Sequence, residues 1–150
     1  MLDYAKTWLA LRGLRTFGVR MERAVQNAAS VAAFLAQHPK VLRVHHPSLP
    51  GHPDQALAGR FLAGQAPAIL AFDLEDEAAA EAFIERLELI RYAPSLGDVS
   101  TIVLHPATTS HRQLPADEQR RLGILPGTIR LSLGIERLDD LKEELSRALA

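Results

Sequence analysis

A segment near the C-terminus that alternates between two kinds of side chain places the strongest constraint on the fold. Residues 127–136 are predicted to form a strand with Leu131, Leu133 and Ile135 on one face and Arg130, Ser132 and Gly134 on the other. The planar fork of Arg binds a carboxylate through two parallel hydrogen bonds, so the second face is typical of a site for an anionic group. A solvated outer face of a sheet is the alternative that this spacing leaves open.

Length and composition favour one domain and argue against several classes of function. The 150 residues, 47% of them hydrophobic, can bury one core but not two ordinary ones. A formal net charge of -1 gives no positive field for nucleic acid, and no basic amphipathic or long apolar segment indicates a membrane. The chain has no Cys and its first residues do not resemble a signal peptide, which favours a cytoplasmic protein.

Hydrophobic periodicity predicts alternating helices and strands in the first half. The expected elements are a helix from Tyr4 capped by Asp3, a long helix over 16–38, a strand over 40–46, a proline-rich loop over 47–53, a helix over 54–62, a strand over 68–74 and a helix over 76–87 capped by Asp76. Apolar residues repeat every three or four positions along the long helix until Pro39 ends the pattern.

The second half is predicted to hold short strands and two helices. Strands over 90–93 and 101–104 flank a turn-rich segment, and helices over 116–122 and 138–149 bracket the strand at 127–136. We expect the acids of the final helix to form a solvated face, and we find no internal repeat. The predicted fold is an α+β domain with a small, mainly antiparallel sheet and helices on one face.

Three ordered motifs resemble the C-terminal part of the pyridoxal-phosphate (PLP)-dependent transsulfuration enzymes of cysteine and methionine metabolism. They are Ser-Leu-Gly-Asp-Val-Ser at 95–100, His-Pro-Ala-Thr-Thr-Ser-His at 105–111 and Ile-Arg-Leu-Ser-Leu-Gly-Ile-Glu at 129–136. Segments 11–16, 21–23 and 41–50 extend the likeness over essentially the whole chain. The resemblance implies that 1–150 is the small C-terminal domain of a fold-type I PLP enzyme with its long connecting helix, and that the PLP-binding large domain is absent.

The resemblance also implies three substrate-binding residues. Arg130 matches the arginine that binds the α-carboxylate of the amino-acid substrate, and Ser95 matches a serine beside the cofactor lysine and that carboxylate. Ser110 matches a hydroxyl-bearing position near the substrate side chain. The residues alone leave simpler roles open, a turn before Gly97 for Ser95 and a capping or loop hydroxyl for Ser110.

The family's cofactor lysine has no counterpart in this chain. Lys6, Lys40 and Lys142 do not stand in the Ser/Thr-Lys motif of the family, and no Gly-rich segment is placed to cradle a phosphate. We therefore expect no catalytic or cofactor-binding residue here, PLP only in the parent enzyme, and no activity of this chain alone. The six histidines form no i, i+4 pair on a helix, so no metal site is expected.

The partners implied by the resemblance are an amino-acid substrate, the PLP-binding large domain and further copies in a homo-oligomer. The segment 109–114 looks most like the branch that acts at the γ-carbon, such as O-acetylhomoserine sulfhydrylase, cystathionine γ-synthase and methionine γ-lyase. Pro94 stands where the lyase branch often has a carboxylate, and the subfamily stays open. The non-enzymatic alternative is a regulatory or scaffold domain that keeps the fold without the chemistry.

Overall fold

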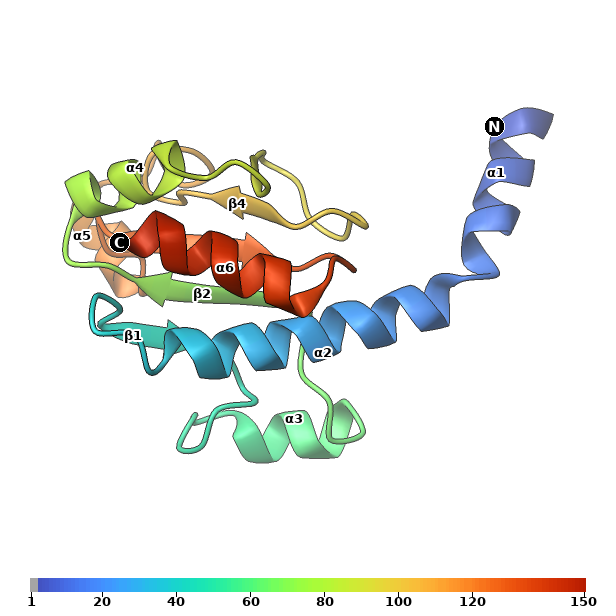
Figure 1. The fold of residues 1–150 in the computed structure, drawn as a ribbon, viewed down its shortest axis with the longest axis horizontal. Helices are drawn as coiled ribbons and strands as arrows, with labels where there is room; N and C mark the ends of the chain where they lie inside the picture. Colours follow the sequence, from blue (N-terminus) through green and yellow to red (C-terminus); the bar gives the residue numbers. More distant parts are fainter. Residues whose placement is uncertain (1–2) are drawn as a thin grey trace.

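The computed structural model describes residues 3–150, where it contains all the helices and strands that the sequence predicts (Figure 1). The helices are α1 (Tyr4–Leu14), α2 (Phe17–Leu35), α3 (Gln55–Phe61), α4 (Glu77–Glu85), α5 (Ala116–Arg121) and α6 (Leu138–Leu149). The strands are β1 (Arg43–His45), β2 (Ile69–Asp73), β3 (Arg91–Tyr92), β4 (Ile102–Leu104) and β5 (Thr128–Ser132).

The five strands form one mixed sheet in the order β1-β2-β5-β4-β3. The pairs β1–β2, β2–β5 and β5–β4 are antiparallel, whereas the short edge strand β3 runs parallel to β4. The expectation of a small, mainly antiparallel sheet is confirmed.

Three helices, α2, α6 and α4, cover one face of this sheet (Figure 1). They bury apolar side chains against alternate residues of the central strands, as a two-layer α+β domain requires. The core includes Ala28, Val31, Leu35, Leu70, Phe72, Phe83, Val103, Ile129, Leu131, Leu141 and Leu145. The rings of Phe72 and Phe83 meet edge to face at the centre, 5.5 Å between centroids. The prediction of helices on one face is therefore confirmed.

The helix starts follow local capping rules. The side chain of Asp3 accepts a hydrogen bond from the Lys6 N–H at 2.9 Å, and that of Asp76 accepts one from the Ala79 N–H at 2.8 Å. Helix α6 has the predicted bounds, but its acids do not form one solvated face. Glu144 is buried, with only 6% of its surface exposed, so that prediction is wrong for this residue.

Strand β5 is shorter than the predicted strand and ends at Ser132. Beyond it the backbone leaves the sheet, because Gly134 N–H donates to the Thr101 hydroxyl and Ile135 N–H donates to the Val99 carbonyl. Ile135 is 39% exposed and does not join Leu131 in the core, so its predicted place on the apolar face is wrong.

The two sides of the sheet are related by an internal repeat. Adding 59 to each residue number of β1 gives β4, and adding 59 to each residue number of β2 gives β5. The pairing repeats as well, since Val44 faces Phe72 in the first half as Val103 faces Leu131 in the second. The expectation of no internal repeat is thus wrong at the level of structure.

An approximate two-fold axis passes through the middle of the sheet. Ala71 and Arg130 are equivalent positions in the two halves, and they are also direct partners across β2 and β5. Because β2 and β5 pair antiparallel around this point, the pairing pattern is the same on either side of it. Arg130 therefore occupies the centre of the sheet, and its counterpart is the small side chain of Ala71.

A buried histidine follows the first strand of each half, and its contact with a proline carbonyl repeats with the same offset. The Nε2 atoms of His46 and His105 lie 2.9 Å and 2.6 Å from the carbonyl oxygens of Pro67 and Pro126. Because a carbonyl can only accept, Nε2 carries the proton in the neutral ring, and Nδ1 accepts from a nearby Ser or Thr hydroxyl. Burial lowers the pKa of His46, and the Pro67 carbonyl only partly opposes this effect.

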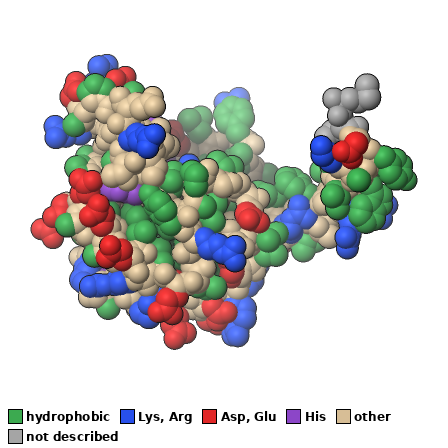
Figure 2. All heavy atoms as spheres, turned by 90° about the horizontal axis from the view of Figure 1, so that it is seen from above, with side chains coloured by type: hydrophobic (Ala, Val, Ile, Leu, Met, Phe, Trp, Pro, Cys, Tyr) green, Lys and Arg blue, Asp and Glu red, His purple; other side chains and the backbone are tan. Residues whose placement is uncertain are grey.

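Helix α1 stands away from the body at the end of α2 (Figure 1). None of its residues is buried, although it carries the large apolar side chains of Trp8, Leu9, Leu11 and Leu14. Figure 2 shows hydrophobic side chains gathered on this projecting arm. Over residues 3–150, no helix combines the length and the apolar character needed to cross a membrane.

Candidate functional site

Arg130 projects from the sheet face opposite the helical layer. Its neighbours in β5, Ile129 and Leu131, are fully buried in the core, and side chains alternate along a strand. Arg130 is flanked by Ala71 on one side and by Leu104 on the other. Arg130 as a whole is half-buried.

The hydrogen-bonding capacity of Arg130 is only partly used by the protein. Its Nη2 donates to the backbone carbonyl of Ser95 at 2.9 Å. Its Nε is buried and has no hydrogen-bond partner among residues 3–150. Leaving a buried N–H unpaired costs about 1–3 kcal/mol, and most such groups in proteins are paired. An oxygen of a bound anion is the kind of acceptor that this side chain lacks.

The turn between β3 and β4, which contains Ser95, is fixed against β5 at a second point. Gly97 N–H donates to the Ser132 hydroxyl at 3.1 Å, and Ser132 lies two residues beyond Arg130 on the same face. Gly97 has a φ of +77°, a conformation that favours glycine. Ser95 itself is exposed, and its backbone carbonyl is the group that contacts the guanidinium. The structure thus brings Arg130 and Ser95 together.

A partly buried polar network anchors the end of this turn. The Glu136 carboxylate accepts from both the backbone N–H and the hydroxyl of Thr101, the latter at 2.8 Å. The Asn27 amide of α2 donates to the carbonyls of Gly134 and Glu136, each at 3.0 Å. A Cβ on Gly134 would lie 2.2 Å from the Val99 carbonyl oxygen, so the backbones touch here. The sequence signal for Asn27 was an amide within the apolar stripe of the long helix.

Ser110 lies elsewhere, on the loop after β4. It is exposed, and its hydroxyl is 2.8 Å from Nδ1 of the adjacent His111. The Gln119 amide holds the loop by donating to the carbonyls of Ala107, His111 and Leu114. No hydrogen bond within residues 3–150 links Ser110 to Arg130 or to Ser95.

A second polar cluster on this sheet face satisfies itself. Both carboxylate oxygens of Asp73 are engaged, one by His45 Nε2 at 2.6 Å and the other by the Thr128 hydroxyl at 2.6 Å. The Thr128 hydroxyl also accepts from the Leu125 N–H at 2.9 Å. Because these groups pair with one another, they are a structural network rather than an open acid or base.

The three lysines lie away from the Arg130 site. Lys6 lies on the projecting helix α1 and pairs with Asp3 at 3.3 Å, while Lys40 donates to the Ala150 carbonyl at 2.5 Å. Lys142 belongs to α6, which covers the sheet face opposite Arg130. No lysine among the described residues therefore faces the Arg130 site. The same part of the chain holds no cluster of three His, Asp or Glu side chains suited to a metal ion.

Two solved enzyme structures share the fold of this chain. The structure matches a putative O-acetylhomoserine (thiol)-lyase from Campylobacter jejuni with a TM-score of 0.92 and 38% identity, over 97% of this chain and 35% of that one. That protein was solved with an N'-pyridoxyl-lysine-5'-monophosphate residue. A cystathionine gamma lyase from Micromonospora echinospora matches with a TM-score of 0.88 and 41% identity, over 97% and 38% of the two chains.

The model of the Cys/Met metabolism PLP-dependent enzyme family matches residues 1–150, and the chain belongs to this family. It is 41% identical over 146 residues to O-acetyl-L-homoserine sulfhydrylase 1 of Thermus thermophilus, covering 97% of this chain and 35% of that protein. It is 42% identical over 149 residues to a cystathionine beta-lyase of Bacillus subtilis, covering 99% and 38%. The chain thus spans little more than a third of the length of these relatives.

Proposed function

We propose that this chain is the C-terminal, substrate-carboxylate-binding domain of a PLP-dependent transsulfuration enzyme. The parent enzyme would perform γ-replacement or γ-elimination on homoserine-derived or sulfur amino acids. The observation that carries the proposal is the buried Nε of Arg130, which has no hydrogen-bond partner within residues 3–150, on a side chain that contacts the exposed Ser95 through its backbone carbonyl. Similarity to sulfhydrylases and lyases supports the reaction class.

Arg130 would bind the α-carboxylate of the substrate. Its Nη2 is held by the Ser95 carbonyl, which fixes the plane of the guanidinium and leaves the Nε–H for a carboxylate oxygen. The permanent charge of Arg keeps this site cationic at every physiological pH. The Ser95 hydroxyl would contact the same carboxylate, and Ser110 would reach the substrate side chain only from its separate loop.

PLP and its lysine would belong to the rest of the parent enzyme, because no lysine within residues 3–150 faces the Arg130 site. Helix α1 and the first turns of α2 would pack against that large domain. An isolated helix of 11 residues is marginally stable in water. Because α1 exposes the large apolar side chains of Trp8, Leu9, Leu11 and Leu14, we infer that another surface covers it in the parent enzyme. The isolated chain would instead associate with further copies of itself.

Carboxylate binding can be tested on the free chain by NMR. Titration with O-acetyl-L-homoserine is expected to shift the Nε–H resonance of Arg130, and its methyl ester, which lacks the carboxylate, is expected to leave that resonance in place. Arg130→Lys keeps the charge but lacks the fork, so it is expected to reduce affinity about tenfold or more. Equal binding by the ester or by the Lys variant would contradict the proposed role.

A complementation experiment distinguishes the enzymatic role from the scaffold alternative. The chain is combined with the remaining N-terminal part of the Thermus thermophilus sulfhydrylase, and sulfhydrylase turnover is measured with PLP. Turnover that Arg130→Lys abolishes supports the enzyme. Turnover that does not change with Arg130→Lys would leave the scaffold role as the only remaining function of this chain. With PLP and borohydride alone, we expect no stoichiometric adduct at Lys6, Lys40 or Lys142.

A further inference from the structure

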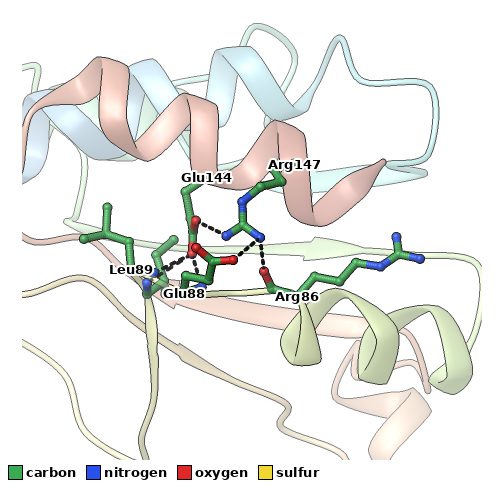
Figure 3. Close-up of polar contacts among 6 residues, drawn as sticks. Arg86, Glu88, Leu89, Glu144 and Arg147 are labelled. Carbon is green, nitrogen blue, oxygen red and sulfur yellow. Dashed lines mark hydrogen bonds and ion pairs between the residues drawn. The ribbon is translucent and has the colours of Figure 1, made fainter.

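Glu144 holds the segment that precedes β3 by a set of convergent hydrogen bonds (Figure 3). Its Oε1 accepts from three consecutive backbone N–H groups, those of Glu88 at 2.5 Å, Leu89 at 2.7 Å and Ile90 at 3.4 Å. Its Oε2 accepts from Arg147 at 2.5 Å. One buried carboxylate from α6 thus satisfies the backbone of a segment more than 50 residues earlier in the chain.

Arg147 closes this cluster on the solvent side. Its guanidinium also donates to the Arg86 carbonyl at 2.7 Å and lies 3.1 Å from the Glu88 carboxylate (Figure 3). Burial by itself raises the pKa of Glu144, but the hydrogen bonds from Arg147 and from the three N–H groups outweigh it and lower the pKa. The carboxylate is therefore charged while it holds the segment.

The segment fixed by Glu144 leads directly to the turn beside Arg130. Strand β3 begins one residue after Ile90 and has only two residues, which pair with β4 on one side. After β3, Ala93 N–H donates to the Val103 carbonyl at 3.1 Å, and Ser95 follows two residues later. An edge strand this short has few contacts of its own to fix its position.

The turn therefore runs between two carboxylate anchors. Glu136 holds the Thr101 end through its N–H and hydroxyl groups, and Glu144 holds the Ile90 end. Between these ends, the turn makes two hydrogen bonds to β5, from Arg130 to the Ser95 carbonyl and from Gly97 to the Ser132 hydroxyl. The geometry of both hydrogen bonds depends on the position at which the segment held by Glu144 leads the chain into the turn.

We propose that Glu144 is a positioning residue for the substrate-carboxylate site, because it fixes β3 and with it the Ser95–Gly97 turn against Arg130. This inference rests on the proposed function for its biological meaning. Its physical content, that a carboxylate on α6 sets the geometry at Arg130 through β3, is a property of the free chain.

The test uses NMR of the ¹⁵N-labelled chain without any ligand. Two probes report on the turn, the Nε–H resonance of Arg130 and the exchange rate of the Gly97 amide. Glu144→Ala removes the acceptors. Glu144→Asp keeps the charge but moves the carboxylate away from the segment, and this variant replaces the Ala variant in the test if the Ala variant does not fold. Either change is expected to shift the Arg130 resonance and to accelerate Gly97 exchange about tenfold or more.

Matched variants separate positioning from general stability. Glu144→Gln keeps a carbonyl oxygen for the backbone N–H groups and is expected to preserve both probes. Glu88→Gln removes only the surface ion pair, and Leu141→Ala weakens the core under the same helix; both are expected to leave the turn unchanged. The proposal is overturned if Glu144→Asp leaves both probes at wild-type values, or if Leu141→Ala moves them equally.

The two proposals fail independently. Loss of coupling between Glu144 and the turn would remove the positioning role while carboxylate binding at Arg130 persists. Absence of carboxylate binding in the Arg130 titration would remove the substrate role while the ligand-free coupling remains measurable.

Discussion

Nη2 of Arg130 donates its hydrogen bond to the main-chain carbonyl of Ser95, not to the Ser95 hydroxyl. The fold therefore uses the backbone at this position and leaves the side chain free. By contrast, the Ser132 hydroxyl accepts the Gly97 N–H and is buried. The two serines of the site thus have different tasks.

This difference predicts that the same substitution, Ser to Ala, has little effect on stability at position 95 and a destabilising effect at position 132. Ser95→Ala is expected to change the free energy of unfolding by less than about 0.5 kcal/mol. Ser132→Ala removes the acceptor of the Gly97 N–H and is expected to cost about 0.5–1.5 kcal/mol. Urea denaturation of both variants measures these values, and a larger loss for Ser95→Ala than for Ser132→Ala would contradict the assignment.

A methyl group at Gly134 is expected to be strongly destabilising. Its Cβ would lie 2.2 Å from the Val99 carbonyl oxygen and 2.7 Å from the Ser100 carbonyl carbon, so the backbone must move. We expect Gly134→Ala to cost about 3 kcal/mol or more in unfolding free energy. Gly59→Ala is the control, because nothing lies within 4 Å of its Cβ and a helical Ala stabilises by about 0.5–1 kcal/mol.

Glu144 predicts a loss of stability in acid. Because its pKa is lowered in the folded state from an ordinary value of 4.5, its contribution is present above that value and is lost as the pH falls through the lower, folded pKa. At pH 7, Glu144→Gln is expected to cost about 1–3 kcal/mol. Urea titrations at pH 7 and between pH 5 and about 3 should show the difference from wild type shrinking in acid. A constant difference would refute the linkage.

His46 predicts a second, milder dependence at higher pH. Its pKa is lowered from 6.5 in the folded state, so below this pH the unfolded chain takes up a proton that the folded chain does not. Stability should fall as the pH drops below 6.5, by at most about 1.4 kcal/mol per pH unit from this residue. His46→Gln can still donate to the Pro67 carbonyl and should flatten the curve; identical slopes would exclude His46 as the source.

Deletion of helix α1 is expected to leave the folded body intact. None of its residues is buried, so removal of residues 1–14 should change the unfolding free energy by less than about 0.5 kcal/mol. The same deletion should reduce self-association, which sedimentation velocity over a range of concentrations measures. The double change Trp8→Gln with Leu11→Gln should act like the deletion if the apolar surface is responsible.

The features that sequence predicts well depend on neighbours along the chain. Asp3 and Asp76 cap helices through bonds to residues three positions away, and the buried stripe from Ala24 to Leu35 follows from helical spacing. The bounds of α6 are predicted for the same reason. The alternation of side chains along residues 127–136 is by itself enough to indicate Arg130 as a candidate anion-binding residue.

The features that sequence misses depend on distant backbone groups. In the sequence Glu144 looks like a surface acid, because its partners, the N–H groups of residues 88–90, meet it only in the fold. Ile135 lies outside the core because the Gly134 N–H donates to the Thr101 hydroxyl and the backbone leaves the sheet there. The internal repeat is hidden because the equivalent halves share geometry more than side chains, as the exchange of Ala71 for Arg130 illustrates. The link between Gly97 and Ser132 likewise requires the folded turn.

The two-fold relation of the sheet has a consequence for how such a site can arise. In a dimer of two identical units, one strand of each unit can pair antiparallel with the same strand of its copy, and β2 pairs with β5 in this register. In a pair of identical units, however, an arginine on the axis would face another arginine, and two like charges would repel across the strands. Joining both halves in one chain lets one position be Arg and the other Ala, so a single cation can stand at the centre of a symmetric frame.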